Sequence, residues 1–346
     1  MNIDDAMSIS AQIKGIQYDV LLSENLKPID FKKIDINEAS PYFLLIDNNS
    51  TYAVSKWVSP KRTRSYPYER VYNTLNNSKK ITIIPIIKDE GLDGDRDYIQ
   101  WDTVSLMSLL DVFVIFAYYD KATKNPKYDN KITDFQFNNR YILSKIKEIK
   151  KYHSSALHWN LKELTHNFQR LVKKVKRSYE IIEKQTGVLL HSQTGIINFQ
   201  KKITKDISIF MEFSREKAEK AQIREIFTIQ PKEMLSTTTK AKITINNYLG
   251  GQYFFTVDEV LIENDTVYLI ESKHSKNSLI PSKSDIKDGL LKMILFSNLT
   301  DVKINGKIVN NIGMLNLTSP LLKGYLKSKH KLNDRVKFFL ENNLIS

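Results

Sequence analysis

Three charged side chains in the C-terminal part of the chain have types and spacing suited to metal-assisted chemistry. Asp258 interrupts an apolar stretch, and Glu271 and Lys273 follow in the sequence Leu-Ile-Glu-Ser-Lys. Because side chains alternate along a strand, Glu271 and Lys273 are expected on one face. Two carboxylates offer the hard oxygen ligands that Mg²⁺ prefers, and a neighbouring ammonium can stabilise negative charge. The chain has no cysteine, which leaves carboxylates as its natural metal ligands.

The residues around these side chains predict a β-hairpin within an α/β core. Strands are expected at 253–262 and 266–273, on either side of a turn at Glu263, Asn264 and Asp265. The remaining pattern from about 205 onward predicts the following elements: a helix around 216–227, strands at 241–248 and near 308–316, a helix at 284–298 and a terminal helix. This order favours a mixed central sheet flanked by helices.

The Asp…Glu-x-Lys pattern resembles the signature of the PD-(D/E)XK nuclease superfamily, and the chain resembles its type II restriction endonucleases. Asp258, Glu271 and Lys273 match the signature, Ser272 is its variable residue, and Val257 replaces its leading proline. The resemblance covers the region 201–346. It implies a restriction-endonuclease-like fold and Mg²⁺-dependent hydrolysis of phosphodiester bonds in double-stranded DNA, with Mn²⁺ as a substitute metal.

The resemblance also implies a role for each residue of the site. Asp258, Glu271 and Lys273 are the expected catalytic residues, and Asp258, Glu271 and the backbone carbonyl of Ser272 are the expected metal ligands. Family members often add a glutamate from the preceding helix, and Glu219 or Glu216 is the candidate here. The alternative for both glutamates is a position on the solvated rim of that helix.

The charge of the chain is unevenly distributed. The 346 residues hold 52 Lys+Arg and 39 Asp+Glu, a formal net charge of +13. Residues 1–130 hold 16 basic and 18 acidic side chains (net −2), so residues 131–346 hold 36 and 21 (net +15). A polyanion such as DNA is therefore the expected partner of the basic part, although a generally lysine-rich composition is the simpler alternative.

Two groups of basic residues are candidate DNA contacts. In the first, Lys61, Arg62, Arg64 and Arg70 are interleaved with aromatic residues, in the manner of a surface that reads or stacks on bases. In the second, Lys276, Lys283 and Lys287 flank the motif and are suited to phosphate contacts. An exposed loop and a solvated lysine face are the respective structural alternatives.

The domain organisation expected from the sequence has three parts. Residues 1–130 form an N-terminal α+β domain for recognition or assembly, 131–200 a helical connector, and 201–346 the nuclease core. An apolar stripe from Leu157 to Ile182 predicts one long helix that ends at Gly187. The stripe favours core packing, with dimerisation as the alternative.

These patterns together indicate a cytoplasmic enzyme of a bacterium or archaeon. The longest apolar run is too short to span a membrane. Cleavage of both strands favours a homodimer, and a restriction enzyme is expected to be paired with a DNA methyltransferase. The competing hypotheses are a nuclease for RNA or for modified or damaged DNA, and a non-catalytic DNA-binding protein with a decayed core.

Overall fold

The computed structural model describes residues 7–48, 50–61, 67–205, 212 and 241–344, and the side chains of 202–205 are not described. The chain is a mixed α/β protein, as predicted, and it divides into two compact units. The first comprises 1–12, 221–245 and 254–346, and the second comprises 13–220 and 246–253. Within the described ranges, no helix has the length and hydropathy needed to cross a membrane.

The second unit is built on a five-stranded mixed sheet in the order β2-β3-β4-β5-β8. Only β3 and β4 pair antiparallel, and the other neighbours are parallel. The strands span Pro28–Asp30 (β2), Tyr42–Asp47 (β3), Ser50–Lys56 (β4), Lys80–Pro85 (β5) and Val112–Ala117 (β8). Its other elements are α1 (Pro67–Tyr72), β6 (Ile87–Asp89), β7 (Arg96–Tyr98), α2 (Trp101–Leu109), β9 (Tyr119–Lys124), β10 (Ile132–Phe137), α3 (Asn139–Lys150), α4 (Ala156–Lys162), α5 (Phe168–Thr186) and α6 (Gln193–Lys205).

Helices α3 and α4 complete the core of this unit. Ile142 and Ile146 of α3 and Trp159 of α4 join buried side chains of the sheet such as Phe43 and Ile83 in one apolar cluster. The Trp159 indole N–H also donates to the Val114 carbonyl at 2.9 Å. The sheet strands are mostly apolar because both faces of the central strands are buried.

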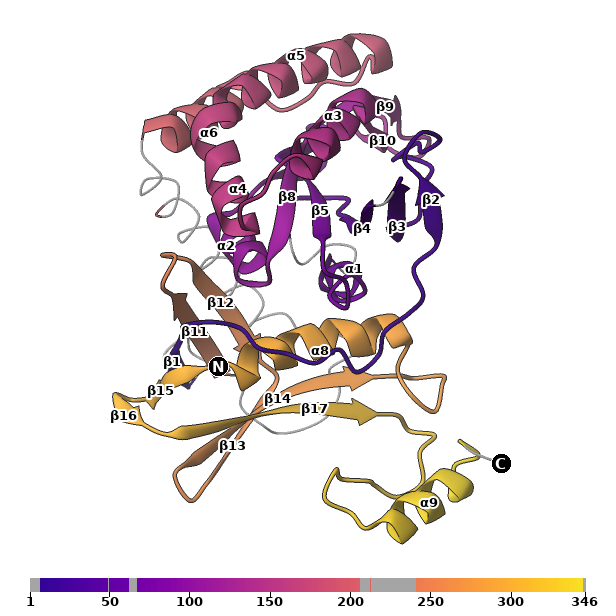
Figure 1. Ribbon diagram of the computed structural model, residues 1–346, viewed down its shortest axis with the longest axis vertical. Coiled ribbons are helices and arrows are strands. Elements are labelled where there is room, and N and C mark those ends of the chain that lie inside the picture. Colours follow the sequence, from indigo (N-terminus) through magenta and orange to yellow (C-terminus); the bar gives the residue numbers. More distant parts are fainter. Residues whose placement is uncertain (1–6, 49, 62–66, 206–211, 213–240, 345–346) are drawn as a thin grey trace. The chain divides into compact units, whose positions relative to one another are not determined.

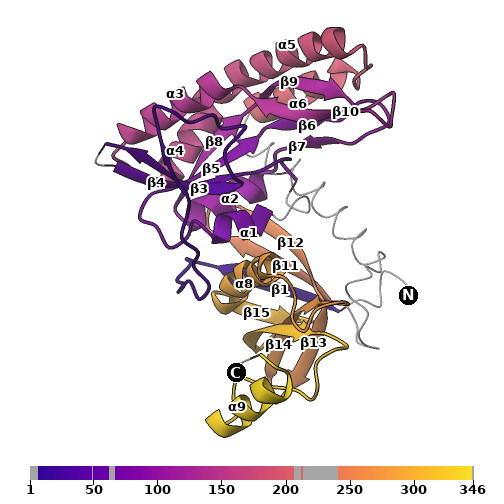
Figure 2. The same ribbon diagram turned by 90° about the vertical axis from the view of Figure 1, so that its right-hand side faces the viewer.

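The expected long helix is present as α4 and α5, joined by a π-helical turn at Glu163–Asn167. Gly187 ends it in the left-handed conformation (φ 68°), as predicted. The apolar stripe is buried from Leu164 to Ile182. Helix α5 lies along β9 (Figure 2), and the buried Ser178 donates to the Tyr119 carbonyl. The stripe therefore packs into the core of its own unit.

The first unit contains two sheets and a helix that packs on one of them (Figure 1). One sheet has the order β12-β11-β1-β15-β16 and the other β13-β14-β17. The strands span Ser8–Ile13 (β1), Ala241–Asn247 (β11), Gln252–Val257 (β12), Glu259–Glu263 (β13), Thr266–His274 (β14), Thr300–Ile304 (β15), Lys307–Ile308 (β16) and Asn310–Thr318 (β17). Helix α8 spans Lys283–Ser297 and packs on β14 and β17, and α9 spans Leu332–Glu341.

Most elements expected from 241 onward are present, but one prediction was wrong. The single strand expected at 253–262 is broken at Asp258 into β12 and β13, which belong to different sheets. The helix expected around 216–227 lies outside the described residues. The small sheet is mixed, because β14 pairs antiparallel with β13 and parallel with β17.

Candidate active site

The β13–β14 hairpin sets the geometry of the Asp…Glu-x-Lys motif. Its turn residues Asn264 and Asp265 both have positive φ (45° and 60°), which suits a tight hairpin with right-handed strand twist. The strands pair with Glu259 opposite Ile270. The ladder ends at this pair, and Asp258 is the next residue along the chain. The turn and the register therefore bring Asp258 beside the end of β14, although it is 13 positions from Glu271 in the sequence.

Asp258 is held at the point where β12 ends and β13 begins. Its Oδ2 accepts a hydrogen bond from the backbone N–H of Ser272 at 2.8 Å. This bond fixes the Asp258 carboxylate beside β14 at the residue between Glu271 and Lys273. The residue that separates β12 from β13 is thus also the residue whose carboxylate is held beside β14.

Glu271 is a buried carboxylate between two ammonium groups. Its side chain is 3% exposed, and its Oε1 and Oε2 lie 3.0 Å from Lys273 Nζ and 2.8 Å from Lys292 Nζ. Burial disfavours the ionised form of Glu271, but attraction to Lys292 and Lys273 outweighs burial and lowers the pKa of the carboxyl. Glu271 is therefore an anion at neutral pH, as a metal ligand has to be.

Lys273 has a second acidic partner on α8. Its Nζ lies 3.0 Å from Glu271 Oε1 and 3.0 Å from Asp288 Oδ2. Burial acts to lower the pKa of Lys273, but attraction to Glu271 and Asp288 is stronger and the pKa is raised. The side chain of Lys273 is thus a fixed cation on the same strand face as Glu271.

The close packing of α8 on the small sheet supports this arrangement. A Cβ atom at Gly289 would lie 2.6 Å from Leu315 Cδ1 and 3.3 Å from Lys273 Cε. The absence of a side chain at Gly289 therefore lets α8 approach β17 and the stem of Lys273 closely. Asp288, next to Gly289, reaches Lys273 because of this approach.

The oxygen atoms of Asp258 and Glu271 fit the donor chemistry of a Mg²⁺ ion that keeps several waters. Both oxygens of Glu271 already face ammonium groups, but each carboxylate oxygen can accept more than one partner. The described residues include no cluster of three or more His, Asp or Glu able to hold a metal. Glu216 and Glu219, the further candidate ligands, lie outside the described residues.

Two members of this network carry roles that the sequence reasoning did not assign. Lys292 and Asp288 are both on α8 and contact Glu271 and Lys273 respectively. They are four residues apart and so share one face of the helix, which is a recognisable spacing. Their partners on β14 follow only from the packing of α8 on that strand.

The candidate phosphate contacts next to the motif lie in different environments. Lys276, after β14, and Lys283, the first residue of α8, are exposed. Lys287 is only 1% exposed, so its side chain lies in the interior of the unit. Lys276 and Lys283 are thus the two of these lysines placed to meet a phosphate in solvent.

The basic–aromatic segment of the second unit is only partly described. Lys61 is half-buried, whereas Arg62 and Arg64 lie outside the described residues. Arg70, on α1, is half-buried, and its Nη1 donates to the Lys56 carbonyl at 2.7 Å. Arg70 therefore helps to hold the end of β4 in place.

Comparisons with protein-family models, with curated proteins and with solved structures gave no match for this chain.

Proposed function

We propose that this chain is a Mg²⁺-dependent endonuclease that hydrolyses phosphodiester bonds of double-stranded DNA in the manner of a type II restriction enzyme. The observation that carries the proposal is the hydrogen bond from the Ser272 backbone N–H to Asp258, because Ser272 is the residue between Glu271 and Lys273. Strands β11 to β14 are followed by α8, β15, β16 and β17, and β17 pairs parallel with β14. A mixed sheet with a helix packed against it therefore carries the motif.

Asp258, Glu271 and the backbone carbonyl of Ser272 would hold the metal ion. When bound, Mg²⁺ supplies charge neutralisation at the scissile phosphate and a water of lowered pKa. Glu271 contributes a carboxylate that stays ionised, because its pKa is lowered by two lysines. The chain thus provides a hard, negatively charged site within a basic part of the sequence.

Lys273 is assigned to charge stabilisation rather than to proton abstraction. Its pKa is raised, so the side chain remains an ammonium at neutral pH and has no lone pair with which to accept a proton. An ammonium held between Glu271 and Asp288 can donate to a phosphate oxygen as negative charge develops there. Its carboxylate partners also limit its movement.

The exposed Lys276 and Lys283 would contact the DNA backbone near the site without reading sequence. Because cleavage of both strands requires two active sites, the enzyme would work as a homodimer. A DNA methyltransferase would protect the host DNA. The competing hypothesis is that the chain hydrolyses the same type of bond in RNA or in modified or damaged DNA.

Incubation of the protein with plasmid DNA and Mg²⁺, followed by sequencing of the fragment ends, tests the proposal. We expect discrete cleavage that stops with EDTA and is abolished by Lys273→Ala while DNA binding is retained. Lys303→Ala, an exposed lysine of the same unit, is the matched control and should cleave normally. Metal-dependent cleavage that survives Lys273→Ala would contradict the assignment.

One observation favours a second candidate, a non-catalytic DNA-binding protein. Both carboxylate oxygens of Glu271 are within ion-pair distance of a lysine, an arrangement that could serve stability alone. Salt-sensitive DNA binding without cleavage in either Mg²⁺ or Mn²⁺ would support this candidate.

A further inference from the structure

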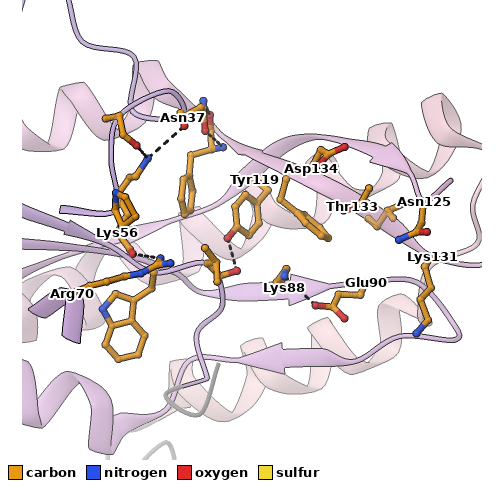
Figure 3. A pocket seen from close by; sticks show the side chains of 17 residues that line it. Asn37, Lys56, Arg70, Lys88, Glu90, Tyr119, Asn125, Lys131, Thr133 and Asp134 are labelled. Carbon is orange, nitrogen blue, oxygen red and sulfur yellow. Dashed lines mark hydrogen bonds and ion pairs between the residues drawn. The ribbon is translucent and has the colours of Figure 1, made fainter. Parts of the chain in front are cut away.

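A pocket of about 450 Å³ lies in the second unit, and the motif has no part in it. The end of β4, strand β6 and the β9–β10 hairpin contribute its walls. Its volume is within the range of small-molecule sites, roughly 300–1,000 Å³. Figure 3 shows Tyr119 in its middle, with Lys56 and Arg70 at one end and Asn125 and Lys131 at the other.

One wall of the pocket is aromatic and rigid. Tyr119 stacks on Phe137 with ring centroids 4.4 Å apart and packs against Phe135 at 5.0 Å. The Tyr119 hydroxyl donates to the Val58 carbonyl at 2.9 Å, which fixes the ring. Phe135 is only half-buried and so presents part of its ring to the pocket. A planar ring of a ligand can stack on such a surface.

The charged lining has an excess of cations. Four basic side chains (Lys56, Arg70, Lys88 and Lys131) face two carboxylates (Glu90 and Asp134), which leaves a net charge of +2 (4 − 2). Lys88 pairs with Glu90 at 3.0 Å and lies 4.8 Å from the Phe135 ring centroid. The pocket therefore combines an aromatic wall with a positive field.

Lys131 is the cation best placed to take an anionic group. Within the described part of the chain its ammonium contacts the Tyr128 ring, 5.0 Å from the centroid, and no carboxylate lies within ion-pair distance. The ammonium of Lys56, in contrast, donates to the carbonyls of Ile36 and Ala39. An incoming phosphate is thus expected at the Lys131 end.

The pocket also includes Arg70, one of the basic residues that the sequence marks as suited to nucleic acid. Lys56 and Trp57, which precede that group in the chain, are lining residues as well. The pocket thus offers a stacking wall, a net positive lining and Lys131, which has no acidic partner among the described residues. These features match the parts of a nucleotide, a planar base and a phosphate.

We propose that this pocket binds one nucleoside monophosphate unit, with its base against Phe135 and its phosphate at Lys131. Two sources share this chemistry: a free nucleotide, and a nucleotide extruded from a DNA duplex. The extruded form rests on the proposed function, because it would make the pocket a reader of the DNA substrate.

Calorimetric titration of the full chain with the four deoxynucleoside 5′-monophosphates tests the pocket. EDTA is present throughout, so that binding is read without any cleavage. We expect at least one nucleotide to bind, and its affinity to fall about tenfold or more in Phe135→Leu and in Lys131→Gln. Lys127→Gln removes an exposed charge from the same loop outside the pocket and should bind as the unchanged protein does.

A duplex that carries 2-aminopurine distinguishes the two sources. A rise in its fluorescence on binding, lost in Phe135→Leu, identifies an extruded nucleotide, and nucleotide binding without this rise identifies the free form. The proposal is overturned if neither free nucleotides nor the duplex engage the pocket, if both pocket variants bind normally, or if inorganic phosphate binds as tightly as a nucleotide. None of these readings depends on Lys273, so failure here and failure of the nuclease assignment are separable.

Discussion

The carboxylate of Asp258 accepts a hydrogen bond from the backbone N–H of Ser272, 2.8 Å away. The bond joins the residue that separates β12 from β13 to the variable residue of the Glu-x-Lys motif. Asp258 is thereby held beside Ser272, the neighbour of Glu271, by a main-chain N–H. Among substitutions at position 272, only proline would remove this donor. The candidate site is therefore fixed by the hairpin itself.

Replacing Asp288 by Asn should slow cleavage while leaving DNA affinity unchanged. Asp288 raises the pKa of Lys273, so its neutralisation lowers that pKa and loosens the ammonium. We expect kcat to fall roughly tenfold and the alkaline limb of the pH–rate profile to move to lower pH. Asp334→Asn, on exposed α9, is the control. An unchanged alkaline limb would show that Asp288 has no effect on Lys273.

Replacing Lys292 by Gln should strengthen metal binding. The ammonium of Lys292 lies 2.8 Å from Glu271 Oε2 and repels a second cation at that carboxylate. Its removal is expected to lower the Kd for Mn²⁺ roughly tenfold, read by calorimetry on the protein alone. Weaker metal binding in this variant would mean that Lys292 chiefly orients Glu271.

Replacing Glu271 by Gln should alter the response of the fold to acid. The pKa of Glu271 is lowered in the folded state, so its stabilising contribution is present above the ordinary carboxyl range and is lost as pH falls through the folded pKa. At neutral pH the variant leaves two lysines facing an uncharged group and should lose about 3 kcal/mol of stability. The difference in Tm from the unchanged protein should shrink on acidification, as followed by circular dichroism. Glu341→Gln, an exposed residue, should show no such convergence.

Replacing Gly289 by Ala should reduce cleavage more than stability. The added methyl would crowd Leu315 and the Lys273 stem, at a cost of about 1–3 kcal/mol, and the higher helix propensity of alanine offsets about 1 kcal/mol of this. A small fall in Tm with a marked fall in kcat is the expected result. Gly15→Ala, where the added atom meets nothing within 4 Å, is the control. Full activity in Gly289→Ala would show that the close approach of α8 is not needed for the site.

Nucleotide binding in the second unit should weaken as pH rises through about 8. The pKa of Lys56 is lowered to about 8 by burial and by Arg70, against the opposing attraction of Asp35 and Glu38. Above that pH the pocket loses one positive charge. Affinity measured by calorimetry between pH 7 and pH 9 should fall, and Lys56→Met should show weaker and flatter binding. A profile in the unchanged protein as flat as that of Lys56→Met would exclude Lys56 as the titrating group.

Local patterns in the sequence predicted much of the motif region. The hairpin turn, the shared face of Glu271 and Lys273, the helix at α8 and the end of α5 at Gly187 each follow from periodicity or turn chemistry. The break at Asp258, which puts β12 and β13 in different sheets, could not be predicted in this way. An apolar stretch has the same sequence pattern whether its strands belong to one sheet or to two. The buried position of Lys287 and the partners of Asp288 and Lys292 depend on how α8 packs, which no local pattern contains.

Strand β1 has a practical consequence for how this protein is made. It lies between β11 and β15, so residues 8–13 complete a sheet whose other strands come from beyond residue 240. On a ribosome, this sheet cannot close until nearly the whole chain has emerged, whereas residues 13–220 of the second unit emerge earlier. A shortened chain that starts at residue 201 would expose two strand edges in the middle of the sheet and should aggregate. Anyone who isolates the candidate nuclease unit has to carry the first strand along, for example by joining it ahead of β11 through a short linker.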